Sequence, residues 1–88
     1  MFVLFEEKNQ VGESEHYFPM HIEGKDKGDC KQKVITHMDS MYGGSCSEGE
    51  GIDRKYDLSD RDVSVDNVKY FETKEELVEA LLKRTEVT

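Results

Sequence analysis

The spacing of the apolar residues changes along this chain, and the change limits the folds that it can adopt. Between residues 16 and 23 apolar and polar residues alternate, so that three apolar side chains share one face: Phe18, Met20 and Ile22. This period of two is typical of a half-buried β-strand. From residue 30 the intervals lengthen to four, four and three, at Cys30, Val34, Met38 and Met41. That spacing is typical of an amphipathic helix, so the chain combines strands and helices.

Two features describe the strands of the N-terminal half. Residues 2–5 are aromatic or aliphatic throughout, which predicts a strand that is apolar on both faces and lies inside a sheet. Pro19 has no N–H group to donate to a neighbouring strand. The strand at residues 16–23 is therefore expected at a sheet edge or at a bulge.

Capping residues mark the limits of two helices. Asp29 is placed as the N-cap of the first helix, and the glycines at 43–44 end it. Thr73 and Glu76 have the spacing of a capping box, and an apolar stripe follows them: Leu77, Val78, Leu81 and Leu82. The second helix is expected to extend to about residue 84, with acids in its first turn and bases in its last turn, as the helix dipole favours.

The region between the helices has a less regular pattern. Residues 43–51 include four glycines, and we expect no regular structure there without a ligand or partner. Val63 and Val65 alternate with polar residues, but the apolar run at 68–71 is out of phase with them. Asp66 and Asn67 must therefore form either a tight turn or a bulge, because a one-residue slip would otherwise expose one of the two runs.

These elements follow the order β-β-α-β-(β)-α. The expected fold class is α+β: a small, mostly antiparallel sheet of three to four strands with two helices packed on one face. The chain has 88 residues, enough for one small hydrophobic core. We therefore expect a single domain over residues 1–88.

Acidic residues greatly outnumber basic ones. Twenty acids against twelve bases give a net charge of −8, which repels nucleic acid and anionic membranes and attracts basic partners. No apolar run approaches the ~18 residues of a membrane helix, and residues 1–5 lack the basic lead of an export signal. With two cysteines and no export signal, we expect a cytoplasmic protein with free thiols.

Motifs for catalysis or for cofactor binding do not emerge from the sequence. The glycine-rich segment follows a helix, has no lysine, and carries Glu48 and Glu50, unlike a phosphate-binding loop. The acids at 60, 62 and 66 are not followed by the glycine and glutamate that an EF-hand calcium loop requires. The acidic neighbours of Cys46 oppose formation of a reactive thiolate. We therefore expect neither an enzyme nor a cofactor.

A small metal-stabilised domain is the alternative interpretation. Cys30, His37 and Cys46 offer the sulfur and nitrogen donors that zinc favours, with His16 or His21 as a fourth ligand. Cys30 and His37 also share a helix face, two turns apart. Structural zinc sites usually take their ligands in pairs two to four residues apart, and the competing interpretation is that Cys30 simply fills the core.

The leading hypothesis concerns the acids between residues 45 and 66. We expect them to form a patch whose contact residues are Glu48, Glu50, Asp53, Asp57, Asp60, Asp62 and Asp66. In an extended strand the aspartates at 60, 62 and 66 share one face, opposite the valines. The patch predicts a non-catalytic, regulatory or inhibitory protein that binds a basic surface on another protein by imitating nucleic-acid phosphates. A solvated face that keeps the domain soluble is the alternative.

In size and charge the chain is similar to the small accessory proteins of phages and mobile elements. Many of those bind and block host factors, so the resemblance implies a viral accessory protein that acts as an inhibitor. It extends to no residue motif. A homo-oligomer formed through an exposed sheet edge is a further alternative, for which the strand near 62–66 is a better candidate than the strand with Pro19.

Overall fold

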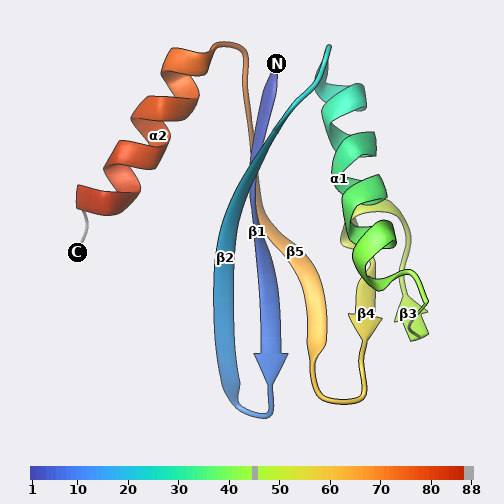
Figure 1. The fold of residues 1–88 in the computed structure, drawn as a ribbon. Helices are drawn as coiled ribbons and strands as arrows, with labels where there is room; N and C mark the ends of the chain where they lie inside the picture. Colours follow the sequence, from blue (N-terminus) through green and yellow to red (C-terminus); the bar gives the residue numbers. More distant parts are fainter. Residues whose placement is uncertain (45, 87–88) are drawn as a thin grey trace.

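Five antiparallel strands form one sheet (Figure 1). The protein is described by a computed structural model that covers residues 1–44 and 46–86. The strands are β1 (Phe2–Val11), β2 (Ser14–Glu23), β3 (Cys46–Glu48), β4 (Lys55–Asp57) and β5 (Asp62–Phe71), in the spatial order β2-β1-β5-β4-β3. The α+β class is confirmed, but the sheet has more than the three to four strands expected. β3 and β4 have three residues each, too few to show a period of two in the sequence.

The spatial order of the strands shows which of them are the outermost strands of the sheet. β2, which carries Pro19, lies at one edge, and β1 lies inside the sheet between β2 and β5, both as expected. β5 is the middle strand, but β4 pairs only with its residues Asp62 and Val63, so self-association through the strand near 62–66 stays a prediction. The second edge is β3.

The glycine-rich segment contains more regular structure than expected. All three residues of β3 pair with β4, and the 3-10 helix η1 (Gly51–Asp53) follows. Gly49 and Gly51 have φ angles of 91° and 61°, a region that glycine adopts without steric cost. The expectation of an irregular loop over 43–51 is wrong because pairing with β4, rather than a ligand, satisfies the backbone of β3.

The first helix, α1 (Lys27–Tyr42), begins slightly earlier than expected. Its N-cap is Asp26, whose carboxylate accepts the N–H of Asp29 at 2.8 Å. Asp29, the expected N-cap, lies in the first turn and accepts the N–H of Lys25 at 2.8 Å. That hydrogen bond is the main reason that the pKa of Asp29 is lowered. The helix ends at Gly43, as expected.

α1 packs against one face of the sheet, and the main core lies between them. Its buried side chains recur every four residues, at Cys30, Val34, Met38 and Tyr42. They form one cluster with four strand residues: Val3 and Phe5 of β1, Tyr56 of β4 and Val63 of β5. The helix predicted from the apolar spacing is therefore confirmed, although Met41 is 56 % exposed and Tyr42 is the last buried position.

A bulge lies in β5, where the sequence allowed either a turn or a bulge. The register with β1 shifts between Leu4↔Lys69 and Glu6↔Asp66, so β5 has one extra residue there. Asn67 has a φ of 51°, and its N–H donates to Asp66 Oδ1 at 2.9 Å. The extra residue brings both apolar runs of β5 onto the α1 side of the sheet, where Val65, Val68 and Tyr70 pack against the core.

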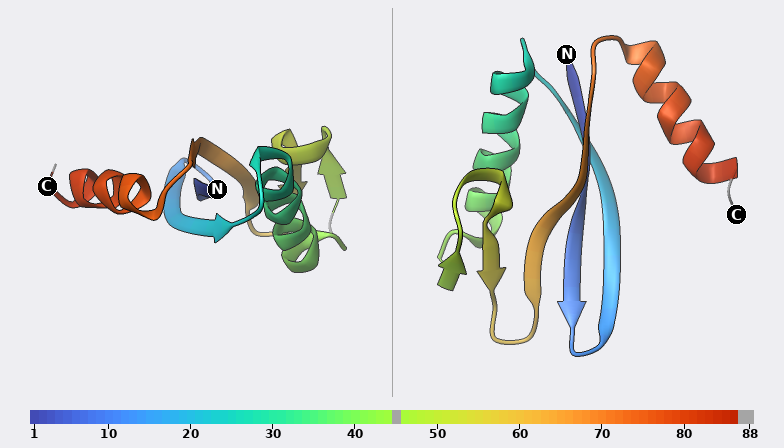
Figure 2. Two further views of the ribbon diagram at one scale, coloured as in Figure 1. Left: turned by 90° about the horizontal axis from the view of Figure 1, so that it is seen from above. Right: turned by 180° about the vertical axis from the view of Figure 1, so that it is seen from behind.

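The second helix, α2 (Lys74–Glu86), begins as expected but lies on the other face of the sheet. The N–H of Glu76 donates to Thr73 Oγ1 at 3.2 Å, as in the predicted capping box. Figure 2 shows, from above, that the strands lie between the two helices. Leu4 alternates with the α1-facing Val3 and Phe5, and it lines a cavity with Ala80 of α2.

The expectation that both helices pack on one face is therefore wrong. Residues 2–5 are apolar on both faces because each face is covered by a different helix at that end of the sheet. Leu77 is 3 % exposed and Leu4 is 2 % exposed, and neither belongs to the cluster beneath α1. We refer to the sheet face opposite α1 as the open face, because α2 covers it only near Leu4.

The molecule is flat and extended for its length. Its principal extents are 39 × 32 × 16 Å, and its radius of gyration is 13.7 Å, compared with about 12 Å for a compact domain of this length.

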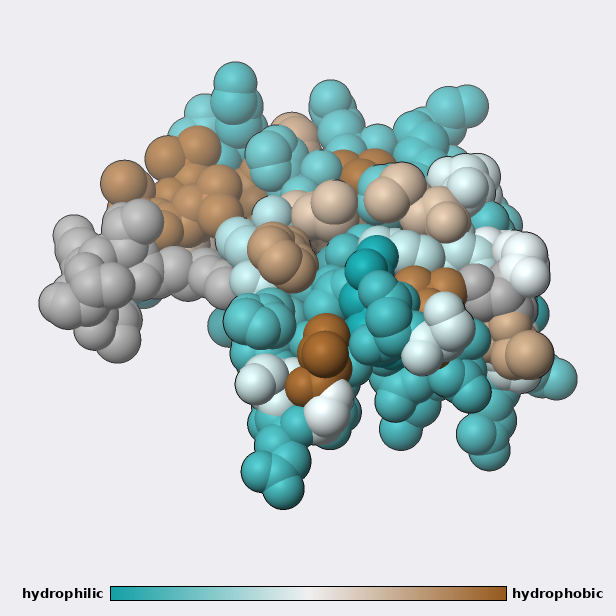
Figure 3. Space-filling model, turned by 60° about the horizontal axis from the view of Figure 1, so that its bottom comes forward, coloured by the Kyte–Doolittle hydropathy of each residue, from teal (hydrophilic) through white to brown (hydrophobic). Residues whose placement is uncertain are grey.

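Among the described residues, no helix has both the length and the apolar character needed to cross a membrane. Figure 3, with the lower end of the molecule forward, shows mostly hydrophilic side chains and a broad apolar area on α2.

Candidate partner-binding face

The side chains of the open face follow from strand register. Tyr56 and Val63 are cross-strand partners, and both belong to the core beneath α1. Because successive side chains of a strand point to opposite faces, their neighbours in β4 and β5 lie on the open face. The same alternation places Lys8 and Gln10 of β1 there, opposite Ser64 and Asp62. In β3 it places Cys46 and Glu48 there, opposite Asp57 and Lys55.

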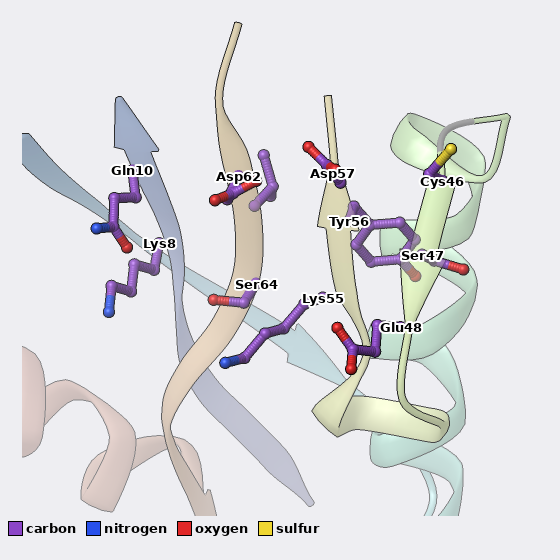
Figure 4. Close-up of a pocket in the computed structure, with 11 residues that line it drawn as sticks. Lys8, Gln10, Cys46, Ser47, Glu48, Lys55, Tyr56, Asp57, Asp62 and Ser64 are labelled. Carbon is purple, nitrogen blue, oxygen red and sulfur yellow. The ribbon is translucent and has the colours of Figure 1, made fainter. Parts of the chain in front are cut away.

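A shallow depression of about 450 Å³ crosses this face from β1 to β3 (Figure 4). Its polar lining comes from four strands: Lys8, Gln10, Cys46, Ser47, Glu48, Lys55, Asp57, Asp62 and Ser64. Tyr56 and Val63, whose side chains belong to the core, also line it. The depression is a groove on a surface, and its lining suits contact with a charged partner.

The open face is strongly acidic. Its strand residues include seven carboxylates, namely Glu6, Glu15, Glu23, Glu48, Asp57, Asp62 and Asp66, and three lysines, Lys8, Lys55 and Lys69. The resulting charge of −4 is half of the net charge of the chain. On the α1 side of the sheet, Glu7 is the only Asp, Glu, Lys or Arg residue of the strands. The net negative charge of the strands is thus concentrated on one face.

The raised pKa of Tyr17 reflects the negative potential of this face. Its hydroxyl donates to Glu15 Oε2 at 2.9 Å, and this hydrogen bond is the largest reason that the pKa of Tyr17 is raised. Desolvation raises the pKa further, as do the negative charges of Glu15, Asp66 and Glu6. Lys8 lies 3.6 Å from the other oxygen of Glu15, so one of the few cations of the face is already close to a carboxylate.

The structure brings together four of the seven acids predicted as contact residues. Glu48, Asp57 and Asp62 line the depression, and Asp66 lies on the same face beside Glu6. Asp66 and Asp62 share a face opposite the valines, as predicted.

The other three predicted acids lie elsewhere. Asp53 belongs to η1, which packs beside α1, and Glu50 lies in the bend before η1. Asp60 was expected on the strand face, but the N–H of Leu58 donates to the carbonyl of Arg61 at 2.8 Å and closes a turn there. The strand therefore begins only at Asp62.

The acids of the first hairpin were not among the predicted contact residues. Glu6 and Glu15 lie on the open face because Glu6 pairs with Asp66 and Glu15 with Gln10. The sequence contained a usable signal, since Glu6 is in phase with Leu4 and out of phase with Val3 and Phe5. Its relation to Asp66 depends on a pairing between strands 60 residues apart, which periodicity alone does not show.

A separate polar cluster lies on the α1 side. The hydroxyl of Tyr56 donates to Asp39 Oδ1 at 2.5 Å, and Arg54 Nη1 lies 3.2 Å from the same oxygen. Burial, followed by the contact with Asp39, raises the pKa of Tyr56. The ring of Tyr42 lies 5.8 Å from that of Tyr56. These groups contact one another, so the cluster joins α1 to β4.

The residues of the alternative metal site do not converge. Cys30 is fully buried in the core, with Sγ 3.5 Å from the carbonyl oxygen of Met1, and His37 packs edge-on against Phe5. Cys46 is exposed and lies on the open face, on the other side of the sheet. Within residues 1–44 and 46–86 no three or more His, Cys, Asp or Glu residues are grouped to hold a metal ion.

Comparisons of the chain with protein-family models, with curated proteins and with solved structures gave no match. A functional interpretation therefore depends on the chemistry of the open face itself.

Proposed function

We propose that this protein is a non-catalytic binding protein that uses the acidic open face of its sheet to bind a basic surface on another protein. The observation that carries the proposal is the convergence of Glu48, Asp57 and Asp62, from three neighbouring strands, around one groove. An acidic face attracts and orients a basic partner before contact and rejects acidic competitors. The fixed strand positions also hold these carboxylates in a constant arrangement.

The chemistry of the groove favours binding over catalysis. Its lining contains no histidine. What the groove offers is carboxylates that accept hydrogen bonds from guanidinium and ammonium groups. Such a face also has the charge that a nucleic-acid-binding surface attracts, so we propose a regulatory or inhibitory action on a partner of that kind.

Charge reversal in the groove tests the proposal. The tagged protein is used to capture partners from a lysate of its native host at low and high salt, with the wild type compared with an Asp57→Lys/Asp62→Lys variant. We expect the variant to bind the captured partner at least about tenfold more weakly, because juxtaposed like charges cost several kcal/mol. High salt is expected to release the partner from the wild type.

A matched control distinguishes the effect of charge in the groove from the effect of the total charge of the protein. Glu50→Lys/Asp53→Lys makes the same change in net charge at exposed positions outside the groove, and it should retain the partner. The proposal is contradicted if both double variants lose the partner equally, or if capture is indifferent to reversal and to salt. Circular dichroism verifies that each variant remains folded.

A further inference from the structure

We infer that the groove of the open face binds a helix with bases along one flank and acids along the other, rather than a uniformly basic surface. The inference rests on the proposed function and adds to it the charge pattern of the partner. It follows from the two sides of the groove, which carry opposite charges.

One side of the groove is a row of cross-strand neighbours. Asp57 of β4 pairs with Asp62 of β5 and with Cys46 of β3. Asp62 pairs in turn with Gln10 of β1. All four residues line the groove. The two aspartates carry the charge of this side, which we call the acidic row.

The other side consists of the residues two positions away along each strand. Lys8 of β1 pairs with Ser64 of β5. Lys55 of β4 pairs with Glu48 of β3. All four residues line the groove. Because alternate residues of a strand lie about 7 Å apart, Lys8 and Lys55 form a basic row beside the acidic row, and Glu48 ends it at β3.

The two lysines of the basic row differ in their neighbours. Lys8 Nζ lies 3.6 Å from Glu15 Oε1. Within residues 1–44 and 46–86, no carboxylate forms an ion pair with Lys55. Figure 4 shows its amine directed towards Ser64 and away from Glu48. The ammonium group of Lys55 is therefore available to an acid of the partner.

A partner that covers the groove removes water from both rows at once. Burial of a charge is costly unless the charge is paired, so a partner with bases alone would leave the ammonium group of Lys55 uncompensated. A partner that places bases over Asp57 and Asp62 and an acid over Lys55 satisfies both rows. The basic row also fixes the orientation, because the reversed orientation brings like charges together.

The dimensions of the groove suit a helix. It crosses the line of strands from β1 to β3, and three spacings of about 4.8 Å give a length of about 14 Å, which corresponds to about nine residues of helix. A helix about 10 Å across that lies along the groove has one flank above each row. An extended strand in the same place would direct half of its side chains away from the sheet.

Two helical peptides of identical composition test the inference. One carries arginines along one flank and glutamates along the other, and the second carries both types mixed on both flanks. A staple on the face away from the protein keeps both peptides helical. We expect the wild type to bind the segregated peptide at least about fivefold more tightly than the mixed peptide at low salt, because only the segregated peptide avoids contacts between like charges. Fluorescence anisotropy measures the two affinities.

Reversal of the basic row distinguishes this charge pattern from a simple preference for positive charge. Lys8→Glu/Lys55→Glu should lose the preference for the segregated peptide and bind oligo-arginine more tightly than the wild type. Lys31→Glu/Lys74→Glu makes the same change in net charge at exposed positions outside the groove, and it should keep the preference. Far-UV circular dichroism shows whether both variants are folded.

The failure of this inference can be told apart from the failure of the proposed function. The inference is overturned if the wild type binds the two peptides equally or binds neither, or if Lys8→Glu/Lys55→Glu keeps the preference. Retention of the lysate partner by Asp57→Lys/Asp62→Lys contradicts the proposed function instead. A protein that loses that partner on reversal of the acidic row but does not discriminate between the peptides keeps the proposed function and excludes the helix with two charged flanks.

Discussion

Two buried tyrosines link α1 to the sheet, and their hydroxyl groups face carboxylates. Tyr56 and Tyr42 are 2 % and 7 % exposed. Burial is the largest cause of the raised pKa of each, followed by the neighbouring carboxylate, which is Asp39 for Tyr56 and Glu7 for Tyr42. A nearby arginine acts in the opposite direction in both cases. The protonated form of each tyrosine is therefore the form that the native structure favours.

This arrangement predicts a loss of stability at alkaline pH. A tyrosine whose pKa is raised by folding keeps its proton in the native state after the unfolded chain has lost it, so the free energy of unfolding falls as pH rises above about 10. Denaturant unfolding across that range measures the fall, and a Tyr42→Phe/Tyr56→Phe variant should show a smaller one. An equally steep fall in this variant would contradict the assignment.

Individual buried polar residues were the least predictable feature. Glu7 and Asn9 are each 7 % exposed, and Asn9 Nδ2 donates to Glu7 Oε2 at 2.9 Å. In the sequence they belong to a polar run that looks exposed throughout. They are buried because they share the α1 side of β1 with Val3 and Phe5, and the side of a strand that is covered depends on tertiary packing rather than on local composition.

At the scale of elements, the bulge of β5 shows how a sequence can present a choice that only the fold resolves. The two apolar runs were out of phase, which required an extra residue or a turn. β1 continues past this point and pairs on both sides of it, so a turn would have broken the pairing of β5 with β1. A bulge keeps the pairing and places both runs on the same face.

Asn67 should be sensitive to the shape of its replacement. At a φ of 51° a β-branched residue is strained, and we expect Asn67→Val to lower the free energy of unfolding by about 1–3 kcal/mol. Asn67→Gly should change it by less than about 1 kcal/mol, because glycine adopts this conformation without strain. Chemical denaturation compares the two variants. Equal stability of Val and Gly at this position would contradict the bulge geometry.

The helices illustrate what periodicity can and cannot predict. Their existence, the buried stripe of α1 and the cap at Thr73 followed from spacing. Of the apolar stripe expected on α2, Leu77 is buried, but Val78 and Leu82 are exposed. The face on which α2 lies did not, because an amphipathic helix packs equally well on any apolar surface. The apolar side chains on both faces of residues 2–5 contained that information, since a strand buried on both sides requires a cover on each.

At the scale of the whole molecule, a flat shape and an uneven charge distribution occur together. The accessible surface is 6027 Å², compared with about 5300 Å² for a compact protein of this mass. Part of the excess reflects the open face, where α2 covers only the end near Leu4. The sequence predicted an acidic segment, and four of its acids lie on this face. The other acids of this face belong to β1 and β2. They lie beside the predicted acids only because β1 pairs with β5, which is distant in the sequence.

The most direct test of the central claim is to map where a basic ligand binds. An oligo-arginine peptide is added to the isotopically labelled protein at low salt, and backbone amide chemical shifts are followed by NMR. We predict that the shifts concentrate in β3, β4, the first half of β5 and the facing part of β1, and that they vanish at high salt. Shifts concentrated instead on the acidic first turn of α2, at Glu75 and Glu76, would contradict the claim that the open face is the binding surface.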